Sequence, residues 1–355
     1  MGEAKKILVT GGAGYIGSHT VITLKEAGFE PIIIDNFVNS SKHMVRSMEA
    51  IIGGPVTLYE GDCQDSALLD TIFKTEGTID AVIHFAALKS VGDSVKEPVR
   101  YYQTNNNALL AVLEAMERWQ AHNIVFSSSC TVYGMPDSLP LTEQSPVKPA
   151  VMPYAHTKQM GEQMLRLTSW CHTQNPTDYH LNALSLRYFN PVGAHPSATI
   201  GELPSGVPSN LIPFLTQAAV GKLKTLSVFG NDYETRDGTC IRDYIHVLDV
   251  AEAHVKAIEY LLGKPEKGYY DVFNIGTGTG STVFELIHAF EQANNLPINY
   301  TVGPRRPGDV PAYYANATKA NEVLHWKHKR TVQQAMKDAW QWQQYYIENE
   351  QAFAD

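Results

Sequence analysis

The sequence predicts an α/β protein in which a doubly wound parallel sheet is followed by a smaller α+β domain. Short apolar segments alternate with helical segments through the first half of the 355-residue chain. A glycine-rich turn joins the first apolar segment to a helix, and strong periodicity is lost soon after residue 190. Apolar strands that alternate with helices are typical of parallel sheets covered by helices on both faces.

The expected strands and helices of the first domain follow one another in order. The strands span residues 7–9, 31–34, 57–59, 81–85, 123–127 and 183–187, and the helices span residues 17–27, 66–75, 98–119 and 153–174. Pro, Gly, Ser and Asn are frequent in residues 191–213, so we expect one domain over residues 1–190 and a second over residues 191–355. Residues 242–262 have the pattern of a strand and a long helix, and are a candidate to pack back on the first domain.

Charge and cysteine content limit the classes of partner. Lys and Arg number 28 against 37 Asp and Glu, a net charge of −9 with no basic cluster. This balance argues against nucleic acid or an anionic membrane as the main partner. The four cysteines are scattered and form no CxxC pair, so we expect reduced thiols, a cytoplasmic protein and no metal site. We also expect no signal peptide, and no apolar run reaches the ~18 residues of a membrane span.

Residues 12–17 read GAGYIG and lie between the first strand and the first helix. Glycines there let the backbone approach a pyrophosphate, whose negative charge the helix N-terminus stabilises. Asp35 ends the next strand, where a carboxylate accepts a hydrogen bond from a ribose hydroxyl and repels the 2′-phosphate of NADP. The order of strand, loop, helix and acid predicts a Rossmann-type NAD site rather than a tight turn followed by an ordinary surface aspartate.

A second glycine cluster, IGTGTGST at residues 275–282, also joins a strand to a helix. It lacks the GxGxxG spacing, and no paired acid follows it on a second strand. We interpret it as a loop in which a Ser or Thr caps the next helix.

Tyr154 and Lys158 are four residues apart and therefore share one face of the expected helix. An ammonium group there is expected to lower the phenol's pKa from its ordinary ~10 and so provide a base. About one such pair is expected by chance, and Tyr260 with Lys264 forms another, which we interpret as that accident. Ser129, at the end of an earlier strand, distinguishes the first pair, because its hydroxyl can bond the same substrate oxygen as the tyrosine.

Two further segments extend strands to the carboxyl edge of the sheet, where doubly wound folds bind ligands. These are HFAALK at 84–89 and RYFNPVGAHP at 187–196. The residues alone leave open whether they are packed strand ends or ligand contacts. Asn190 suits either a phosphate contact or a turn before Pro191.

Long stretches of the chain resemble UDP-glucose 4-epimerases of the extended short-chain dehydrogenase family. They are TGGAGYIGSH, HFAALKSVGDSV, FSSSCTVYG, LRYFNPVGAHPS, VFGNDY, GTCIRDYIHVLDVAEAH and PRRPGDVPAYYA, and they span nearly the whole chain. The resemblance implies an NAD-dependent isomerase of galactose metabolism that interconverts UDP-galactose and UDP-glucose. The reaction would proceed through a 4-keto intermediate by transient hydride transfer to tightly bound NAD, in a cytoplasmic homodimer.

The resemblance also implies roles for individual residues. The catalytic residues would be Ser129, Tyr154 and Lys158. NAD would be held by Gly11, Gly14, Tyr15, Ile16, Gly17, Asp35, Asn36, Asn39, Ser40, Asp62, Cys63, Phe85, Ala86, Ala87, Lys89, Asn105, Tyr154, Lys158 and Tyr188. The UDP-sugar would be held by Lys89, Ser129, Tyr154, Phe189, Asn190, Asn210, Leu211, Phe229, Arg242, Arg306, Asp309 and Tyr313. The two arginines would contact the diphosphate and Asp309 the uridine ribose.

The chain departs from the family pattern in a few places. Ala87 stands where the family usually has Gly, and Thr104 where many relatives have an Asn on the nicotinamide side, so that role is carried over to Asn105. Tyr313 is a large residue at a position expected to exclude N-acetylated sugars. The helices at 98–119 and 153–174 would form the dimer's bundle, although their apolar faces would equally suit the core.

Two other functions are alternatives to the epimerase. A nucleotide-sugar 4,6-dehydratase on the same fold would need an acid and a base directly after Ser129, where this chain has Cys130 and Thr131. A non-catalytic NAD-sensing regulator would have no use for the Ser129, Tyr154 and Lys158 set.

Overall fold

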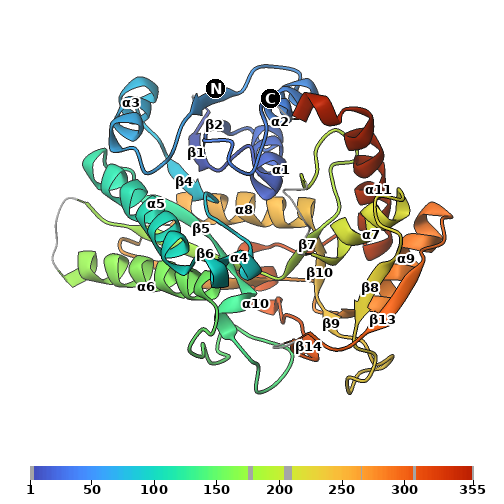
Figure 1. The fold of residues 1–355 in the computed structure, drawn as a ribbon. Helices are drawn as coiled ribbons and strands as arrows, with labels where there is room; N and C mark the ends of the chain where they lie inside the picture. Colours follow the sequence, from blue (N-terminus) through green and yellow to red (C-terminus); the bar gives the residue numbers. More distant parts are fainter. Residues whose placement is uncertain (1–3, 175–178, 204–209, 265, 307–308, 354–355) are drawn as a thin grey trace.

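A seven-stranded sheet forms the centre of the computed structural model, which describes residues 4–174, 179–203, 210–264, 266–306 and 309–353 (Figure 1). The strand order is β11-β6-β5-β4-β1-β2-β3, and every neighbouring pair is parallel. The strands are β1 (Lys6–Thr10), β2 (Glu30–Asp35), β3 (Thr57–Glu60), β4 (Ala81–His84), β5 (Asn123–Ser129), β6 (Asn182–Tyr188) and β11 (Tyr270–Ile275). The predicted fold class is confirmed, and β11 is a strand that the sequence pattern did not assign to this sheet.

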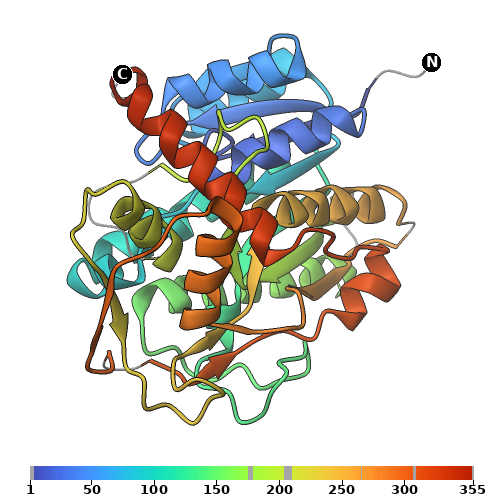
Figure 2. The same ribbon diagram turned by 90° about the vertical axis from the view of Figure 1, so that its right-hand side faces the viewer.

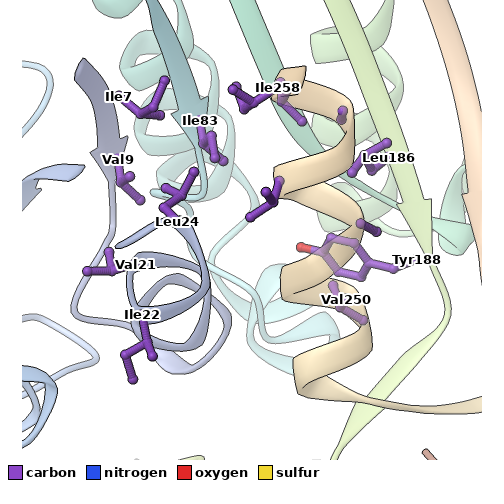
Figure 3. Packing of buried hydrophobic residues seen from close by; sticks show 14 of the residues in the cluster. Ile7, Val9, Val21, Ile22, Leu24, Ile83, Leu186, Tyr188, Val250 and Ile258 are labelled. Carbon is purple, nitrogen blue, oxygen red and sulfur yellow. The ribbon is translucent and has the colours of Figure 1, made fainter. Parts of the chain in front are cut away.

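Both faces of the sheet are covered by helices, which explains the continuous apolar character of its strands. Helices α1 (Tyr15–Glu26) and α8 (Val247–Leu262) pack against each other on one face. Figure 3 shows Leu24 of α1 and Ile258 of α8 between Val9 of β1 and Leu186 of β6. The other face carries α3 (Ser66–Glu76), α5 (Pro98–Arg118) and α6 (Pro153–Gln174), which pack on Leu8 and the alternate residues of the neighbouring strands.

A second cluster of apolar residues lies outside the central sheet. It joins α7 (Leu211–Ala219), α9 (Val283–Asn294) and α11 (Val332–Glu348) to the parallel pair β8 (Leu226–Phe229) and β13 (Tyr300–Gly303). Figure 2 shows α11 as the red helix that runs beside the orange α9. Strand β11 belongs to the central sheet, and helix α8 packs on that sheet. We therefore propose a domain division near residue 190, after which the chain returns to the first domain over these two elements.

Three short pairings connect these regions. Strand β7 (Asn190–Val192) pairs with β10 (Tyr244–His246), and β9 (Ile241–Arg242) lies between β12 (Ser281–Thr282) and β14 (Ala312–Tyr313). The remaining elements are α2 (Lys42–Ile52), α4 (Val91–Lys96), α10 (Thr318–Leu324) and the 3-10 helices at Cys130–Tyr133 and Glu350–Phe353. Over the described ranges, we find no helix with the length and apolar character that a bilayer crossing requires.

Candidate active site

The glycine-rich turn after β1 requires glycine for steric reasons. Gly11 has a φ of 71°, and a Cβ there would lie 2.9 Å from the Ala86 nitrogen. A Cβ at Gly17 would collide with the carbonyl oxygen of Gly11. Helix α1 begins at Tyr15 directly after Gly14, which provides no side-chain cap. The first amides of α1 are therefore available to an anion at the helix N-terminus.

A cleft of about 350 Å³ opens above this turn, at the carboxyl ends of β1, β2, β4 and β5. The sheet order reverses between β1 and β4, and such switch points are where doubly wound folds bind ligands. The cleft is lined by nearly all of the residues predicted to hold NAD, namely Gly11, Gly14, Tyr15, Ile16, Gly17, Asp35, Asn36, Asn39, Ser40, Asp62, Cys63, Phe85, Ala86, Ala87, Lys89, Tyr154, Lys158 and Tyr188. The space beside Gly11, which a Cβ there would fill, faces the N-terminus of α1. This arrangement fits the pyrophosphate of a dinucleotide.

Asp35 joins the two sides of the cleft at the end of β2. Its Oδ2 accepts a hydrogen bond from the Ala13 amide at 2.9 Å, within the glycine-rich turn. Its Oδ1 accepts from the Phe37 amide at 2.9 Å and the Ser40 hydroxyl at 2.8 Å. The carboxylate thus holds the turn in place while lining the cleft.

Asn105 is the predicted cofactor residue that lies outside the cleft lining. Its Oδ1 accepts from the Leu88 amide at 2.8 Å, and its Nδ2 donates to the Leu88 carbonyl and the Thr157 hydroxyl, both at 3.1 Å. Asn105 thus fixes the loop after β4 against α6, and its neighbour Thr104 lines the cleft; the cofactor contact of Asn105 stays a prediction. Consecutive side chains on a helix differ in direction by about 100°, so Thr104 and Asn105 point to different surroundings.

Further lining residues were not predicted from the sequence. They are Val38, Gln64, Leu88, Arg100, Thr104, Ser127, Gly201 and Leu203, among others. Arg100 and Thr104 are four residues apart on α5, and Ser127 is two residues before Ser129 on β5. Helical and strand periodicity could therefore have indicated that these residues face the same side as a predicted site residue. Gly201 and Leu203 lie in an irregular segment and had none.

Tyr154 lies near the start of α6, at the inner end of the cleft, and is 9% exposed. Burial raises the pKa of Tyr154 well above its ordinary value, the charge of Tyr188 adds to this rise, and a side-chain hydrogen bond with Ser129 opposes it. The net shift is therefore upward, opposite to the lowering that we expected from Lys158. Ser129 Oγ accepts hydrogen bonds from the Thr131 amide at 3.2 Å and the Thr131 hydroxyl at 3.0 Å.

The position of Lys158 explains that difference. Its ammonium donates to the Ser127 carbonyl at 2.6 Å and lies 4.9 Å from the centre of the Phe126 ring, against 5.9 Å from that of Tyr154. Burial lowers the pKa of Lys158 to about 8, and the nearby charge of Glu162 opposes the shift. The lysine is thus held by backbone and ring contacts rather than by the phenol oxygen.

A buried ion pair fixes α6 against the strands that carry these groups. Glu162 on α6 accepts from the Arg187 guanidinium of β6 at 2.8 and 2.6 Å and from the Ser128 hydroxyl of β5 at 2.6 Å. The two charged side chains are 8% and 6% exposed. Since Glu162 lies one helical turn after Lys158, the pair sets the position of the lysine over β5.

The residues predicted to hold UDP lie on segments beyond the cleft. Arg242 donates to Asp309 at 3.2 Å and to the Val310 carbonyl at 2.7 Å, and the Arg306 guanidinium lies 4.0 Å from the centre of the Phe229 ring. Asn210 and Leu211 form the N-cap and first residue of α7, and Asn190 begins β7. The structure thus pairs Arg242 with Asp309 and Arg306 with Phe229.

Tyr313 is buried beside the turn that follows Ser129. Its hydroxyl donates to the carbonyl oxygens of Cys130 at 2.7 Å and Gly134 at 3.1 Å. Its ring centre lies 5.9 Å from that of Phe189, another predicted substrate contact. The side chain therefore supports the backbone next to Ser129 in addition to occupying volume.

Comparison with known proteins gives a consistent result. Residues 8–339 match the family described as GDP-mannose 4,6 dehydratase. A UDP-glucose 4-epimerase of Bacillus subtilis is 48% identical over 337 residues, which cover 95% of this chain and 96% of that protein. A crystal structure of the Stenotrophomonas maltophila UDP-glucose-4-epimerase with bound NAD and formylated UDP-arabinopyranose aligns with a TM-score of 0.91 at 42% identity, over 97% and 99% of the two chains. The Bifidobacterium longum UDP-glucose 4-epimerase in complex with NAD⁺ and UDP aligns with a TM-score of 0.89 at 44% identity, over 98% and 100%.

Proposed function

The chain belongs to the UDP-glucose 4-epimerase family, and from this premise we propose that it interconverts UDP-galactose and UDP-glucose with Tyr154 as the acid–base group. The observation that carries the assignment is the placement of Tyr154 and Lys158 together in the lining of the dinucleotide cleft. NAD, when bound in this cleft, supplies the acceptor and donor of a hydride.

Each residue of the site has a defined part in this reaction. Tyr154 takes the proton of the sugar's 4-hydroxyl and returns it after the bound 4-ketose has turned over. Ser129 hydrogen-bonds the same oxygen, and the positive charge of Lys158 favours the phenolate form of Tyr154 once the site is filled. Because burial raises the pKa of the phenol, Tyr154 must first release its own proton to solvent, and the phenolate that remains is the base.

Turnover of the ketose requires a firm hold on the nucleotide and few contacts to the hexose. Arg242 and Arg306 bind the diphosphate, and Asp309 binds the uridine ribose. In the structure Arg242 is hydrogen-bonded to Asp309, and the Arg306 guanidinium lies over the Phe229 ring. These contacts hold the two guanidinium groups in defined positions, from which they can bind an anionic ligand.

The dehydratase alternative is disfavoured by the chemistry after Ser129. Elimination of water needs an acid and a base there, and the chain supplies Cys130 and Thr131. Burial raises the pKa of the Cys130 thiol to about 12, and the Thr131 hydroxyl and amide are both bonded to the Ser129 hydroxyl at 3.0 and 3.2 Å. Neither group can transfer a proton as a carboxyl pair would.

We also propose a cytoplasmic homodimer. Helices α5 and α6 contact each other and expose Val99, Leu110, Leu167 and Trp170, with exposed fractions between 43% and 65%. Apolar side chains gathered on two adjacent helices suit a bundle with a second copy. A monomeric mass in light scattering at micromolar concentration would contradict the dimer.

The function is tested by incubating the pure protein with UDP-galactose and resolving the products by anion-exchange chromatography. We expect UDP-glucose to form without added oxidant, and NAD to be released when the protein is denatured. A 4-keto-6-deoxy product would identify a dehydratase, and an unchanged substrate with NAD bound would favour the regulator.

A further inference from the structure

The second glycine cluster, residues 275–282, surrounds the carboxylate of Asp243 rather than a ligand. The Thr277 amide donates to Oδ1 at 2.9 Å, and its hydroxyl donates to the same oxygen at 2.6 Å. The Gly278 amide donates to Oδ2 at 3.2 Å, and the Ala315 amide donates to it at 3.1 Å. Asp243 is fully buried, so an anion-binding loop is filled by the protein's own side chain.

Glycine is needed in this loop because of the carboxylate. A Cβ at Gly276 would lie 2.6 Å from Asp243 Oδ2 and 2.7 Å from the Ala315 Cβ. Burial raises the pKa of the Asp243 carboxyl, and the hydrogen bonds from Thr277, Ala315 and Gly278 oppose that rise. The helix that follows is capped separately, by Thr282 with Glu285 in a capping box, as predicted.

The backbone of Asp243 connects two further segments. Its amide donates to the Tyr313 carbonyl at 3.0 Å, and its carbonyl accepts from the Asn190 amide at 2.9 Å. The preceding residue is Arg242, whose guanidinium bonds Asp309 and Val310. One residue therefore joins β7, β9, β14 and the glycine loop, and three of these segments carry proposed UDP-sugar contacts.

We propose that Asp243 is a positioning residue of the nucleotide-sugar site. Successive side chains of an extended segment point to opposite sides, so anchoring the carboxylate in the glycine loop directs Arg242 the other way, toward Asp309. The same anchor fixes the start of β7 at Asn190. This inference rests on the proposed function, because it takes the ligand to be a UDP-sugar.

The test compares UDP affinity with NAD content in folded variants. Asp243→Asn places an amide NH₂ opposite the Gly278 or Ala315 amide and leaves a buried donor without an acceptor. We expect its calorimetric Kd for UDP to rise by about tenfold or more, a loss of the size that one unsatisfied buried group produces. The KM for UDP-galactose should rise with it, kcat should stay within about threefold, and the NAD bound per chain should not change.

Two further variants keep the test decisive. Thr277→Val removes one hydroxyl donor at nearly constant volume and should raise the UDP Kd by about threefold, a graded effect that remains measurable if the Asn variant does not fold. Asp338→Asn is the matched control. Its carboxylate is equally buried and bonds His246 Nε2 at 3.0 Å and Gln334 at 2.7 Å, so UDP affinity should stay unchanged.

The outcomes separate this inference from the proposed function. A folded Asp243→Asn or Thr277→Val variant with the UDP affinity of the unmodified protein would overturn the positioning role alone. So would a parallel loss of NAD, or an equal loss of UDP affinity in Asp338→Asn, because either indicates a general structural defect. An unmodified protein that binds UDP without epimerising UDP-galactose would remove the proposed function and leave the inference standing. Failure to bind UDP at all would overturn both.

Discussion

Replacement of Tyr154 by Phe removes one oxygen atom from the site and little else. The ring is 9% exposed and lies at the inner end of the NAD cleft, so the phenyl group of the variant fills the same space. What is lost is the proton-transfer group and whatever hydrogen bond its oxygen makes in the site.

The two losses differ greatly in size. One hydrogen bond contributes about 1 kcal/mol to stability, so the variant should fold and keep its NAD. A positioned general base contributes roughly 10²–10⁴-fold to the rate, and we expect kcat to fall by at least about 10³-fold because no neighbouring base replaces it. His156, the nearest imidazole along α6, is exposed and bonds the Tyr102 hydroxyl at 3.0 Å, outside the cleft lining.

The assay follows conversion of UDP-galactose to UDP-glucose by chromatography, with the UDP Kd measured by calorimetry on the same preparation. Tyr260→Phe is the matched control, because Tyr260 and Lys264 form the other Tyr–x–x–x–Lys pair. There the ammonium lies 4.8 Å from the ring centre, and the Tyr260 hydroxyl is hydrogen-bonded to that of Tyr269 at 3.2 Å. Its turnover should be unchanged.

Turnover by Tyr154→Phe within about tenfold of the unmodified enzyme would refute the assignment of the base. In that case Ser129 would be the next group to test. A loss of UDP affinity in parallel with activity would instead show that the phenol supports the fold of the site.

Four other predictions follow from the same contacts. Lys158→Ala should lose turnover and bound NAD together, and activity of the unmodified enzyme should decline as pH rises through the lysine's pKa of about 8. Burial of the charged ammonium lowers the unfolding free energy at pH values below 8, and this destabilisation disappears as the pH rises toward 10.5, the ordinary pKa of lysine. The activity should therefore decline without a fall in the unfolding free energy. Unfolding over the same pH range would refute this explanation. The unmodified enzyme should bind NAD more tightly than NADP, and Asp35→Asn should narrow the ratio of the two Kd values; equal affinities in the unmodified enzyme would defeat the repulsion argument. Glu162→Gln should lower the unfolding free energy in urea by about 3 kcal/mol, because the Arg187 guanidinium stays buried without its counter-charge, and a change below about 1 kcal/mol would contradict this. Tyr313→Cys should raise activity on UDP-N-acetylglucosamine and lower activity on UDP-galactose and UDP-glucose. Tyr313→Phe keeps the volume and loses only the bonds to the turn, so its pocket should still exclude N-acetylated sugars. Comparable kcat/KM for both sugar classes in the unmodified enzyme would refute the steric argument.

Sequence patterns predicted the bounds of a helix well where apolar residues recur with the helical period. The predicted helix over 153–174 has the observed bounds Pro153–Gln174, and the helix over 98–119 differs from the observed Pro98–Arg118 by one residue. The sequence pattern did not assign β11 to the central sheet, because its partner β6 is distant in sequence and no local pattern shows which strands pair.

The sequence by itself determined the doubly wound sheet, the glycine turn that must approach a phosphate, and the spacing that brings Tyr154 and Lys158 to one helical face. These are consequences of short-range geometry, which residue size and periodicity encode directly. Only the tertiary structure decided that Lys158 bonds the Ser127 carbonyl, that Asn105 bonds the backbone of Leu88, and that the second glycine cluster holds Asp243. Each depends on backbone groups or side-chain directions brought together across long stretches of chain. Every residue except proline has the same backbone N–H and C=O groups, so the sequence does not show which of them will meet.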